Sequence, residues 1–500
     1  MNYDVIIIGA GLGGLTAGAK LARSGKKVLL VEQHNIPGGC ATTFKRKEFT
    51  VEVGLHEMDG LDDLDTKKAI FENLDVFNSI ELIRLPEFYR FISPNIDFVM
   101  PDDAEKATAK LTKKFPREEK GIKNYFKQIR GIRKEIPKLP RSKFWQTVLF
   151  PIYPLLFPFV VRNAKKSIGG FLDEIIKDDD LKLLLTANLG YFHDDPYSMA
   201  MLYFATAQDA YYAGSWYIKG GSQKLSDYLA SCITNNGGEI VYRHLVEQII
   251  VEDGKATGVV YRKKSKKETA HITAKAAHII ANNAVPLLSK MLPEESSQKL
   301  EEQIKRLENS CSVITLYLGF SKSPKALGNK YYSTFMANPD VKNQIDFAED
   351  LKHSGFDKRQ LIFVDYSQID SGLAPEGKAL GVLATSDYGK DWENLSREEY
   401  KAKKEKVSQV LIARLEKLIP GITAHIEYYE LATAKTVERF TMNPGGAVYG
   451  FSQTPAQGGA NRFGTKLPIK NLHIASAWGF PGGGFTGAII SGFLTSLKIK

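Results

Sequence analysis

The first forty residues constrain the fold of this chain more than any other stretch. The apolar run at 5–8 is typical of a parallel strand that is buried on both faces. It leads into a glycine-rich turn, a helix-like segment at 15–22 and a second apolar strand at 27–31, which ends on Glu32. A strand, a turn, a helix and a second strand in this order predict a βαβ unit that binds a dinucleotide.

The turn of this unit carries a G-x-G-x-x-G pattern at Gly9, Gly11 and Gly14, and Gly13 is also glycine. The first glycine permits the tight turn, the second lets the backbone approach a pyrophosphate, and the third lets helix pack on strand. Glu32 lies eighteen positions past Gly14 (32 − 14), where its carboxylate can accept hydrogen bonds from ribose hydroxyls. A purely structural turn is the alternative, and the flanking strands and helix disfavour it.

A second pair of glycines follows Glu32 at short range. Gln33 and His34 lead to Gly38-Gly39-Cys40, and the later segment 49–56 ends in Gly54-Leu55-His56. This pattern resembles the FAD signature of flavin oxidoreductases related to amine oxidases and phytoene desaturases. Within that group it is most similar to the retinol saturase and carotenoid isomerase branch.

The resemblance implies roles for the residues of both motifs. His56 would lie near the isoalloxazine, although a histidine in the core is an equal alternative. A surface turn is the alternative for Gly38 and Gly39. The residues of this region that the resemblance assigns to FAD are Gly9, Gly11, Gly13, Gly14, Glu32, Gln33, Gly38, Gly39 and Cys40.

The end of the chain carries another glycine-rich segment. A strand at 471–477 leads into residues 478–487, and a helix at 488–497 follows. Gly482, Gly484 and Gly487 form a second G-x-G-x-x-G, but only thirteen residues remain after Gly487 (500 − 487), too few for another dinucleotide fold. We therefore expect this helix N-terminus to face the same cofactor, near the ribityl chain or the flavin pyrimidine edge.

The phytoene desaturase group ends with a similar flavin-binding segment, so the resemblance covers both ends of the chain. Many relatives place an acidic residue before the Pro-Gly stretch, whereas this chain has Ala475-Ser476-Ala477-Trp478. The ribityl contact is therefore left to a backbone amide or to Ser476. The resemblance also implies an adenosine contact through the backbone of Val246. The remaining residues that it assigns to FAD are Gly482, Gly483, Gly484, Phe485 and Thr486.

The length of 500 residues and a hydrophobic content of 43% predict two interleaved domains. The resemblance implies an α/β fold, with a Rossmann-type FAD-binding domain of the amine oxidase/phytoene desaturase type and an interleaved α+β substrate domain. We assign residues 1–60, 215–295 and 464–500 to the FAD-binding domain. Residues 61–214 and 296–463 form the substrate domain, which faces the membrane.

The stretch 144–161 carries no charge and is rich in aromatic residues, while Arg162, Lys165 and Lys166 follow it. Three prolines would interrupt a bilayer-spanning helix. A shallow monotopic insertion fits better, with aromatic rings at the interface and cations near lipid phosphates. A buried core segment or the wall of a hydrophobic substrate tunnel is the alternative. Both interpretations indicate an apolar substrate or apolar surroundings.

Composition narrows the function classes further. The net charge of +10 favours anionic partners, but the basic residues are scattered without a recognition motif, so nucleic-acid binding is not expected. The three cysteines are Cys40, Cys232 and Cys311, too few and too far apart for a disulfide framework. They fit a reducing compartment. No signal peptide is recognisable, so we expect a cytoplasmic protein at the membrane. The histidines lack metal-ligand spacing, and no metal site is expected.

The sequence and the resemblance together predict an FAD-dependent oxidoreductase. It would act on conjugated double bonds of a long apolar polyene, a carotenoid or retinoid, by desaturation, saturation or cis–trans isomerisation. Aromatic residues between 191 and 217 could line a cavity for such a flat ligand, or could be ordinary helical core. The alternatives are a flavin amine oxidase and a non-catalytic flavin-binding protein at the membrane.

Overall fold

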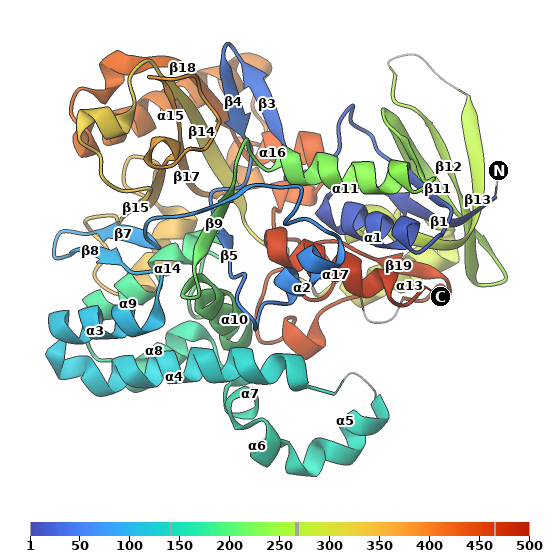
Figure 1. Ribbon diagram of the computed structural model, residues 1–500, viewed down its shortest axis with the longest axis horizontal. Coiled ribbons are helices and arrows are strands. Elements are labelled where there is room, and N and C mark those ends of the chain that lie inside the picture. Colours follow the sequence, from blue (N-terminus) through green and yellow to red (C-terminus); the bar gives the residue numbers. More distant parts are fainter. Residues whose placement is uncertain (1, 141–142, 266–269, 465–466, 500) are drawn as a thin grey trace.

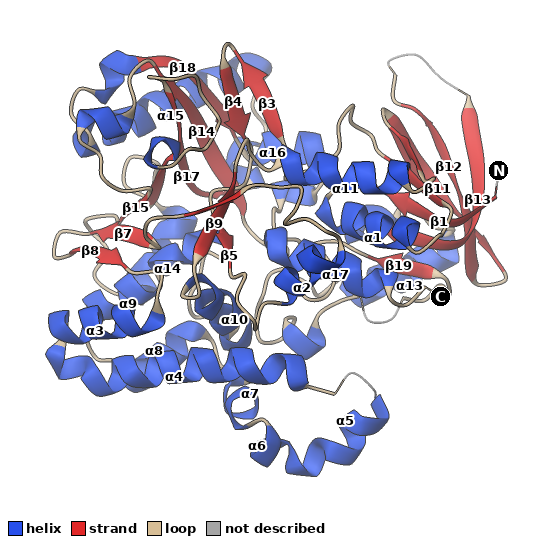
Figure 2. Ribbon diagram, in the orientation of Figure 1, coloured by secondary structure: helices blue, strands red, loops and turns tan. Residues whose placement is uncertain are grey.

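The computed structural model describes residues 2–140, 143–265, 270–464 and 467–499. Two large β-sheets lie toward opposite ends of the longest axis of the molecule, and helices occupy the space around and between them (Figures 1 and 2). Both chain termini lie beside the first of these sheets (Figure 1).

The first sheet has seven strands in the order β10-β2-β1-β13-β12-β11, and β19 pairs with β13. Four pairs are parallel: β1 with β2, β1 with β13, β2 with β10, and β13 with β19. Strand β12 is antiparallel to both of its neighbours, β11 and β13. Residues 5–8 are buried at the centre, as a strand that is apolar on both faces requires. This parallel core is the predicted Rossmann-type arrangement. Its strands are β1 (Asn2–Ile8), β2 (Val28–Val31), β10 (Glu239–Val241), β11 (His244–Glu252), β12 (Lys255–Lys263), β13 (His271–Ala281) and β19 (Leu472–Ile474).

Three helices pack closely beside this sheet: α1 (Leu12–Arg23), α11 (Gln223–Asn235) and α17 (Gly484–Ser496). A Cβ on Gly18 of α1 would lie 2.6 Å from Cδ1 of Ile233 in α11. A Cβ on Gly492 of α17 would lie 2.2 Å from the carbonyl oxygen of Gly13 in α1. These glycines let the last helix of the chain pack directly on the first.

The second sheet also has seven strands, in the order β18-β14-β17-β16-β15-β7-β8. Its neighbours are antiparallel except for the parallel pair of β15 and β7. Apolar residues of the long helix α15 (Arg397–Leu418) pack in one hydrophobic cluster with the sheet. The strands are β7 (Tyr89–Ile92), β8 (Asp97–Met100), β14 (Ser312–Phe320), β15 (Ser333–Met336), β16 (Leu361–Asp365), β17 (Ala379–Asp387) and β18 (Ile426–Ala432).

Two small sheets and the remaining helices complete the fold. The small sheets are β3 (Thr43–Arg46) with β4 (Phe49–Glu52), and β5 (Met58–Asp59), β9 (Ser215–Ile218) and β6 (Leu82–Arg84) in the order β5-β9-β6. The helices are α2 (Thr66–Asn73), α3 (Ala104–Lys114), α4 (Glu119–Glu135), α8 (Ile168–Ile175), α9 (Asp179–Leu185), α10 (Met201–Tyr211), α12 (Val285–Ser289), α13 (Glu294–Ile304), α14 (Gln344–His353) and α16 (Ala434–Thr441).

Residues 143–163 form an arm that protrudes beyond α4 (Figure 1). This apolar arm consists of α5 (Lys143–Leu149), α6 (Tyr153–Leu156) and α7 (Pro158–Asn163), so the stretch forms short helices, as its prolines predict. Phe144, Phe150 and Leu155 are 66%, 72% and 82% exposed, and these side chains are therefore not buried core. Within the described residues, no helix combines the length and the apolar character needed to cross a bilayer.

The chain leaves the first sheet and returns to it twice. The strands of the first sheet come from residues 2–31, 239–281 and 472–474, whereas those of the second come from 89–100 and 312–432. The domain limits 1–60, 215–295 and 464–500, with 61–214 and 296–463 between them, stay a prediction. Residues 1, 141–142, 266–269, 465–466 and 500 of that assignment lie outside the described residues.

Candidate functional site

A cavity of about 1670 Å³ brings together glycine-rich segments from both ends of the chain. Residues of both large sheets also contribute to its wall, for example Ile8 of β1 and Thr315 of β14. Gly14 and Gly482 are the two predicted site residues that do not line this cavity. The predicted residues that do line it are Gly9, Gly11, Gly13, Glu32, Gln33, Gly38, Gly39, Cys40, His56, Val246, Ser476, Gly483, Gly484, Phe485 and Thr486.

The turn between β1 and α1 forms one side of the site. Helix α1 begins after Gly11 without a side-chain cap, so no side chain in the described ranges accepts from its first N–H groups. Gly38 donates its N–H to the carbonyl of Ala10 at 2.7 Å, and Gly11 and Gly38 form an isolated parallel bridge. The two glycine motifs of the N-terminal region are thus held side by side.

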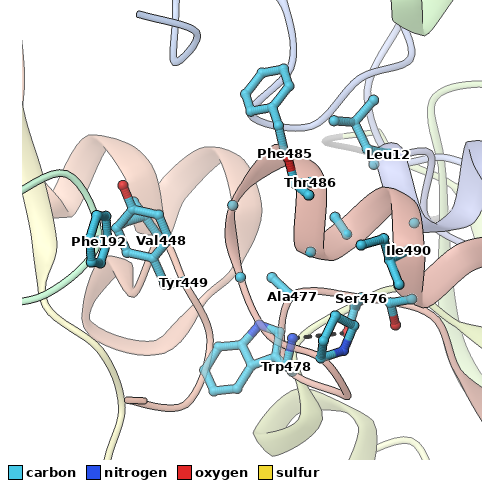
Figure 3. A pocket seen from close by; sticks show the side chains of 18 of the residues that line it. Leu12, Phe192, Val448, Tyr449, Ser476, Ala477, Trp478, Phe485, Thr486 and Ile490 are labelled. Atoms are coloured by element: carbon cyan, nitrogen blue, oxygen red, sulfur yellow. Dashed lines mark hydrogen bonds between the residues drawn. The ribbon is translucent and has the colours of Figure 1, made fainter. Parts of the chain in front are cut away.

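The start of α17 forms a second side. Gly483 precedes the helix, again without a side-chain cap, and a Cβ on Gly484 would meet no atom within 4 Å. Figure 3 shows Phe485 and Thr486 at the beginning of this helix, beside the segment that carries Ser476, Ala477 and Trp478. Two uncapped helix N-termini on one cavity suit a ligand with several anionic or hydrogen-bond-accepting groups, as a dinucleotide has.

Glu32 is fixed at the carboxyl end of β2. Its Oε2 accepts from the N–H of Ala10 at 2.6 Å, and its Oε1 accepts from the N–H of His34 at 2.7 Å. Each carboxylate oxygen can accept more than one hydrogen bond, so these contacts leave lone pairs for a ligand. The carboxylate therefore closes the turn and still faces the cavity.

His56 lies among tyrosines on the cavity wall. Its ring stacks on Tyr191 with centroids 5.8 Å apart, and its Nδ1 lies 3.3 Å from the hydroxyl of Tyr366. Burial lowers the pKa of His56 to about 4, so the imidazole is neutral near pH 7. Such a ring can exchange hydrogen bonds but does not supply a permanent positive charge.

Thr486 and Ser476 have well-defined partners. The hydroxyl of Thr486 donates to Asp59, whose carboxylate lies 4.0 Å from the ammonium of Lys67. Ser476 is buried, and its Oγ accepts from the N–H of Trp478 at 3.3 Å. Burial raises the pKa of Cys40 to about 11, so its thiol stays protonated and is a poor nucleophile.

Sequence reasoning missed three residues at the site, of which Asn282 and Glu57 line the cavity and Arg462 does not. Asn282 donates from Nδ2 to the carbonyl of Gly9 at 3.1 Å, beneath the glycine turn. Arg462 is buried and donates to backbone carbonyls, including those of Phe451 and Ala477. Glu57 lines the cavity beside His56, and both of its carboxyl oxygens are buried without a hydrogen-bond partner among the described residues. Asn282 directly follows the apolar end of β13, so it had a signal in the sequence, whereas Glu57 lies in a mixed segment and had none. Arg462 also had none.

A comparison with protein families gives a match over residues 12–499 to the flavin containing amine oxidoreductases. The chain belongs to this family. The match confirms the predicted resemblance, the α/β fold with a Rossmann-type FAD-binding domain, and the prediction of an oxidoreductase enzyme. Membership also supports a flavin cofactor.

Individual relatives match along the whole chain. The prolycopene isomerase of Daucus carota is 27% identical over 100% of this chain and 80% of its own length. The all-trans-retinol 13,14-reductase of Danio rerio is 25% identical over 98% of this chain and 85% of its own. A structure of putrescine oxidase has a TM-score of 0.66 at 16% identity and covers 100% of this chain and 99% of that one, which shows a shared fold.

Proposed function

We propose that this family member is an FAD-dependent enzyme acting on conjugated double bonds of a long apolar polyene, a carotenoid or a retinoid. The cavity is the observation that carries the proposal. Its volume of about 1670 Å³ exceeds the range of roughly 300–1,000 Å³ usual for one small ligand. There is room for a dinucleotide and a second, elongated molecule.

FAD is the flavin that the site fits best, because its pyrophosphate and adenosine need contacts that a mononucleotide does not. We assign the pyrophosphate to the start of α1 and the ribose to Glu32. Val246 would contact the adenosine, and the start of α17 the flavin end. Bound FAD supplies the two-electron redox chemistry, while these residues orient it and exclude water.

An apolar polyene suits the rest of the wall. The aromatic residues that line the cavity include Tyr191, Phe192, Tyr203, Tyr211 and Tyr449. Aromatic faces bind flat conjugated chains through area and stacking. The isomerase and reductase relatives are named for polyene substrates, which supports the same substrate class here.

The cavity extends to the base of the apolar arm. Ile136, Leu139, Tyr153 and Val160 line this end of it. The exposed aromatic side chains of the arm suit insertion into the interfacial layer of a membrane. We infer that the protein binds a membrane surface peripherally through residues 144–161, so that a lipid-dissolved substrate can enter directly.

A flavin amine oxidase is less well supported, since the whole-length relatives reported above are named for polyenes. The test is an absorption spectrum of the purified protein, then anaerobic addition of prolycopene and all-trans-retinol in detergent. Oxidised-flavin bands, and a polyene that changes geometry or saturation, are the expected result. A protein that binds no FAD, or hydrogen peroxide release with amines only, would contradict the proposal.

A further inference from the structure

Glu57 occupies an unusual position for a carboxyl group. It follows His56, precedes β5 and lines the cavity, yet it is only 8% exposed. Neither of its oxygens has a hydrogen-bond partner in the described part of the chain. Leaving a buried polar group unsatisfied costs about 1–3 kcal/mol, so a role toward a ligand is the simplest reason to keep it.

Nearby Glu52 shows what a structural carboxylate looks like in this fold. It is also buried, but it accepts from the N–H and the hydroxyl of Ser222, and from the N–H groups of Gly54 and Leu55. These bonds join β4 to the start of α11. Glu57 makes no comparable bond to any residue that the structure describes, and a structural role does not account for it.

The surroundings of Glu57 favour the neutral acid. The charged groups that act on it are Glu87 and Asp59, both acidic, and burial together with these charges raises its pKa well above the usual value. Glu87 accepts from the N–H of Tyr332 at 2.6 Å, and Asp59 is engaged by Thr486 and Lys67. Other titratable groups near it include the neutral imidazole of His56 and the phenols of Tyr89, Tyr191, Tyr211 and Tyr332.

We propose that Glu57 is the proton-transfer residue of the polyene site: its carboxyl donates a proton to a double-bond carbon, and the resulting carboxylate takes a proton back. The inference rests on the proposed function. A general acid or base must lie within hydrogen-bonding reach of the atom that gains or loses the proton. Glu57 meets this requirement because its carboxyl group lines the cavity and is not held by another partner among the described residues.

The step balances without an oxidant or a reductant. The O–H bond of Glu57 breaks, and the two π electrons of one double bond form a C–H bond with the proton. The positive charge spreads along the remaining conjugated bonds, and the former double bond rotates as a single bond. The Glu57 carboxylate then removes the hydrogen that this carbon carried before the transfer, so the transferred proton stays on the carbon. The double bond forms again with the other geometry, and the O–H bond is restored.

The experiment uses the flavin-loaded protein equilibrated in D2O with prolycopene in detergent. Deuterium in the recovered polyene is measured by mass spectrometry. The wild type should introduce deuterium. E57Q, which keeps the size of the side chain but has no acidic proton, should lose the reaction by about 100-fold or more. The matched control is E87Q, a neighbouring carboxylate that does not line the cavity, which should keep deuterium incorporation.

A second readout does not depend on turnover. The infrared spectrum of the wild type near neutral pH should contain the carbonyl band of a protonated carboxyl group that is missing in E57Q and present in E87Q, while all three proteins bind flavin. Isomerisation without deuterium incorporation, an active E57Q, or no E57Q-sensitive band would overturn the role of Glu57 alone. A wild type that alters no polyene would overturn the proposed function and this inference with it.

Discussion

The hydroxyl of Thr486 donates to the carboxylate of Asp59, across a sequence separation of 427 residues. This bond joins the first turn of α17 to β5, directly after Glu57 and His56. The same carboxylate faces the ammonium of Lys67, which also contacts Asp65 at 2.6 Å. The C-terminal helix is therefore positioned at the cavity by a polar network from the N-terminal part of the chain.

Removal of that hydroxyl should weaken flavin binding. In Thr486→Val the first turn of α17 loses its bond to Asp59 at nearly constant side-chain shape. We expect the flavin Kd to rise about 5- to 10-fold, the equivalent of roughly 1–1.4 kcal/mol. Fluorescence titration of the apoprotein with FAD measures the change. Thr486→Ser keeps the hydroxyl donor and should bind FAD nearly as tightly as the wild type does. A valine variant with the same FAD affinity as the wild type would contradict the prediction.

Packing of the last helix on the first should tolerate no added methyl group. In Gly492→Ala the new Cβ would lie 2.2 Å from the carbonyl oxygen of Gly13, so the helices must separate. We expect a loss of about 1–3 kcal/mol in stability. The matched control is Gly190→Ala, whose Cβ would meet no atom within 4 Å. Thermal unfolding of both variants tests this, and similar Tm values would argue against close packing.

The buried guanidinium of Arg462 should be important for stability. It donates to the carbonyls of Phe451 at 2.6 Å, Ala477 at 2.9 Å and Gly479 at 3.2 Å. Arg462→Met leaves these buried acceptors unpaired, and we expect a loss of about 3 kcal/mol or more. Arg117→Met, at an exposed arginine, is the control. Chemical denaturation measures the free energy of unfolding of both variants, and an equal decrease in the two would contradict the role of Arg462.

The apolar arm should be needed for membrane binding but not for flavin binding. The triple variant Phe144→Ser, Phe150→Ser, Leu155→Ser removes side chains that are at least 66% exposed. Because burying each such side chain contributes up to about 1.5–3 kcal/mol, we expect liposome binding to fall at least about 10-fold. Phe77→Ser, Ile345→Ser, Tyr429→Ser removes other exposed apolar groups and should bind as the wild type does. Flotation with anionic vesicles measures both variants.

Acidification should destabilise the protein partly through His56. Burial lowers its pKa from the usual value near 6.5 to about 4. Between these values the unfolded chain binds more protons, so the stabilisation is present above about pH 6.5 and is lost as the pH falls toward 4. We expect the Tm of the wild type to fall more steeply from pH 7 to 5 than that of His56→Gln. His353→Gln, at a 59% exposed side chain, should keep the wild-type slope.

Local sequence patterns were sufficient to predict the βαβ unit. The apolar run 5–8, the glycines that follow it and the strand ending on Glu32 are read within one segment, where strand and turn preferences act between near neighbours. The prolines of the apolar arm are similarly local, and the structure has short helices there. The resemblance at both ends then pointed to one flavin oxidoreductase family, and the family match agrees.

The contacts that complete the cavity join residues far apart in the chain, and no local pattern encodes them. The partners of Thr486 and Arg462 depend on how α17, β5 and the loop at 449–452 come together. The protonation state of Glu57 also depends on the tertiary structure, because burial and the nearby acidic groups raise its pKa and its position in the sequence shows neither. The sequence by itself determined the nucleotide-binding unit and the family, since near neighbours set strand, turn and helix. Only the tertiary structure decided which side chains share the cavity and which of them lack a partner, since burial and long-range contacts set both.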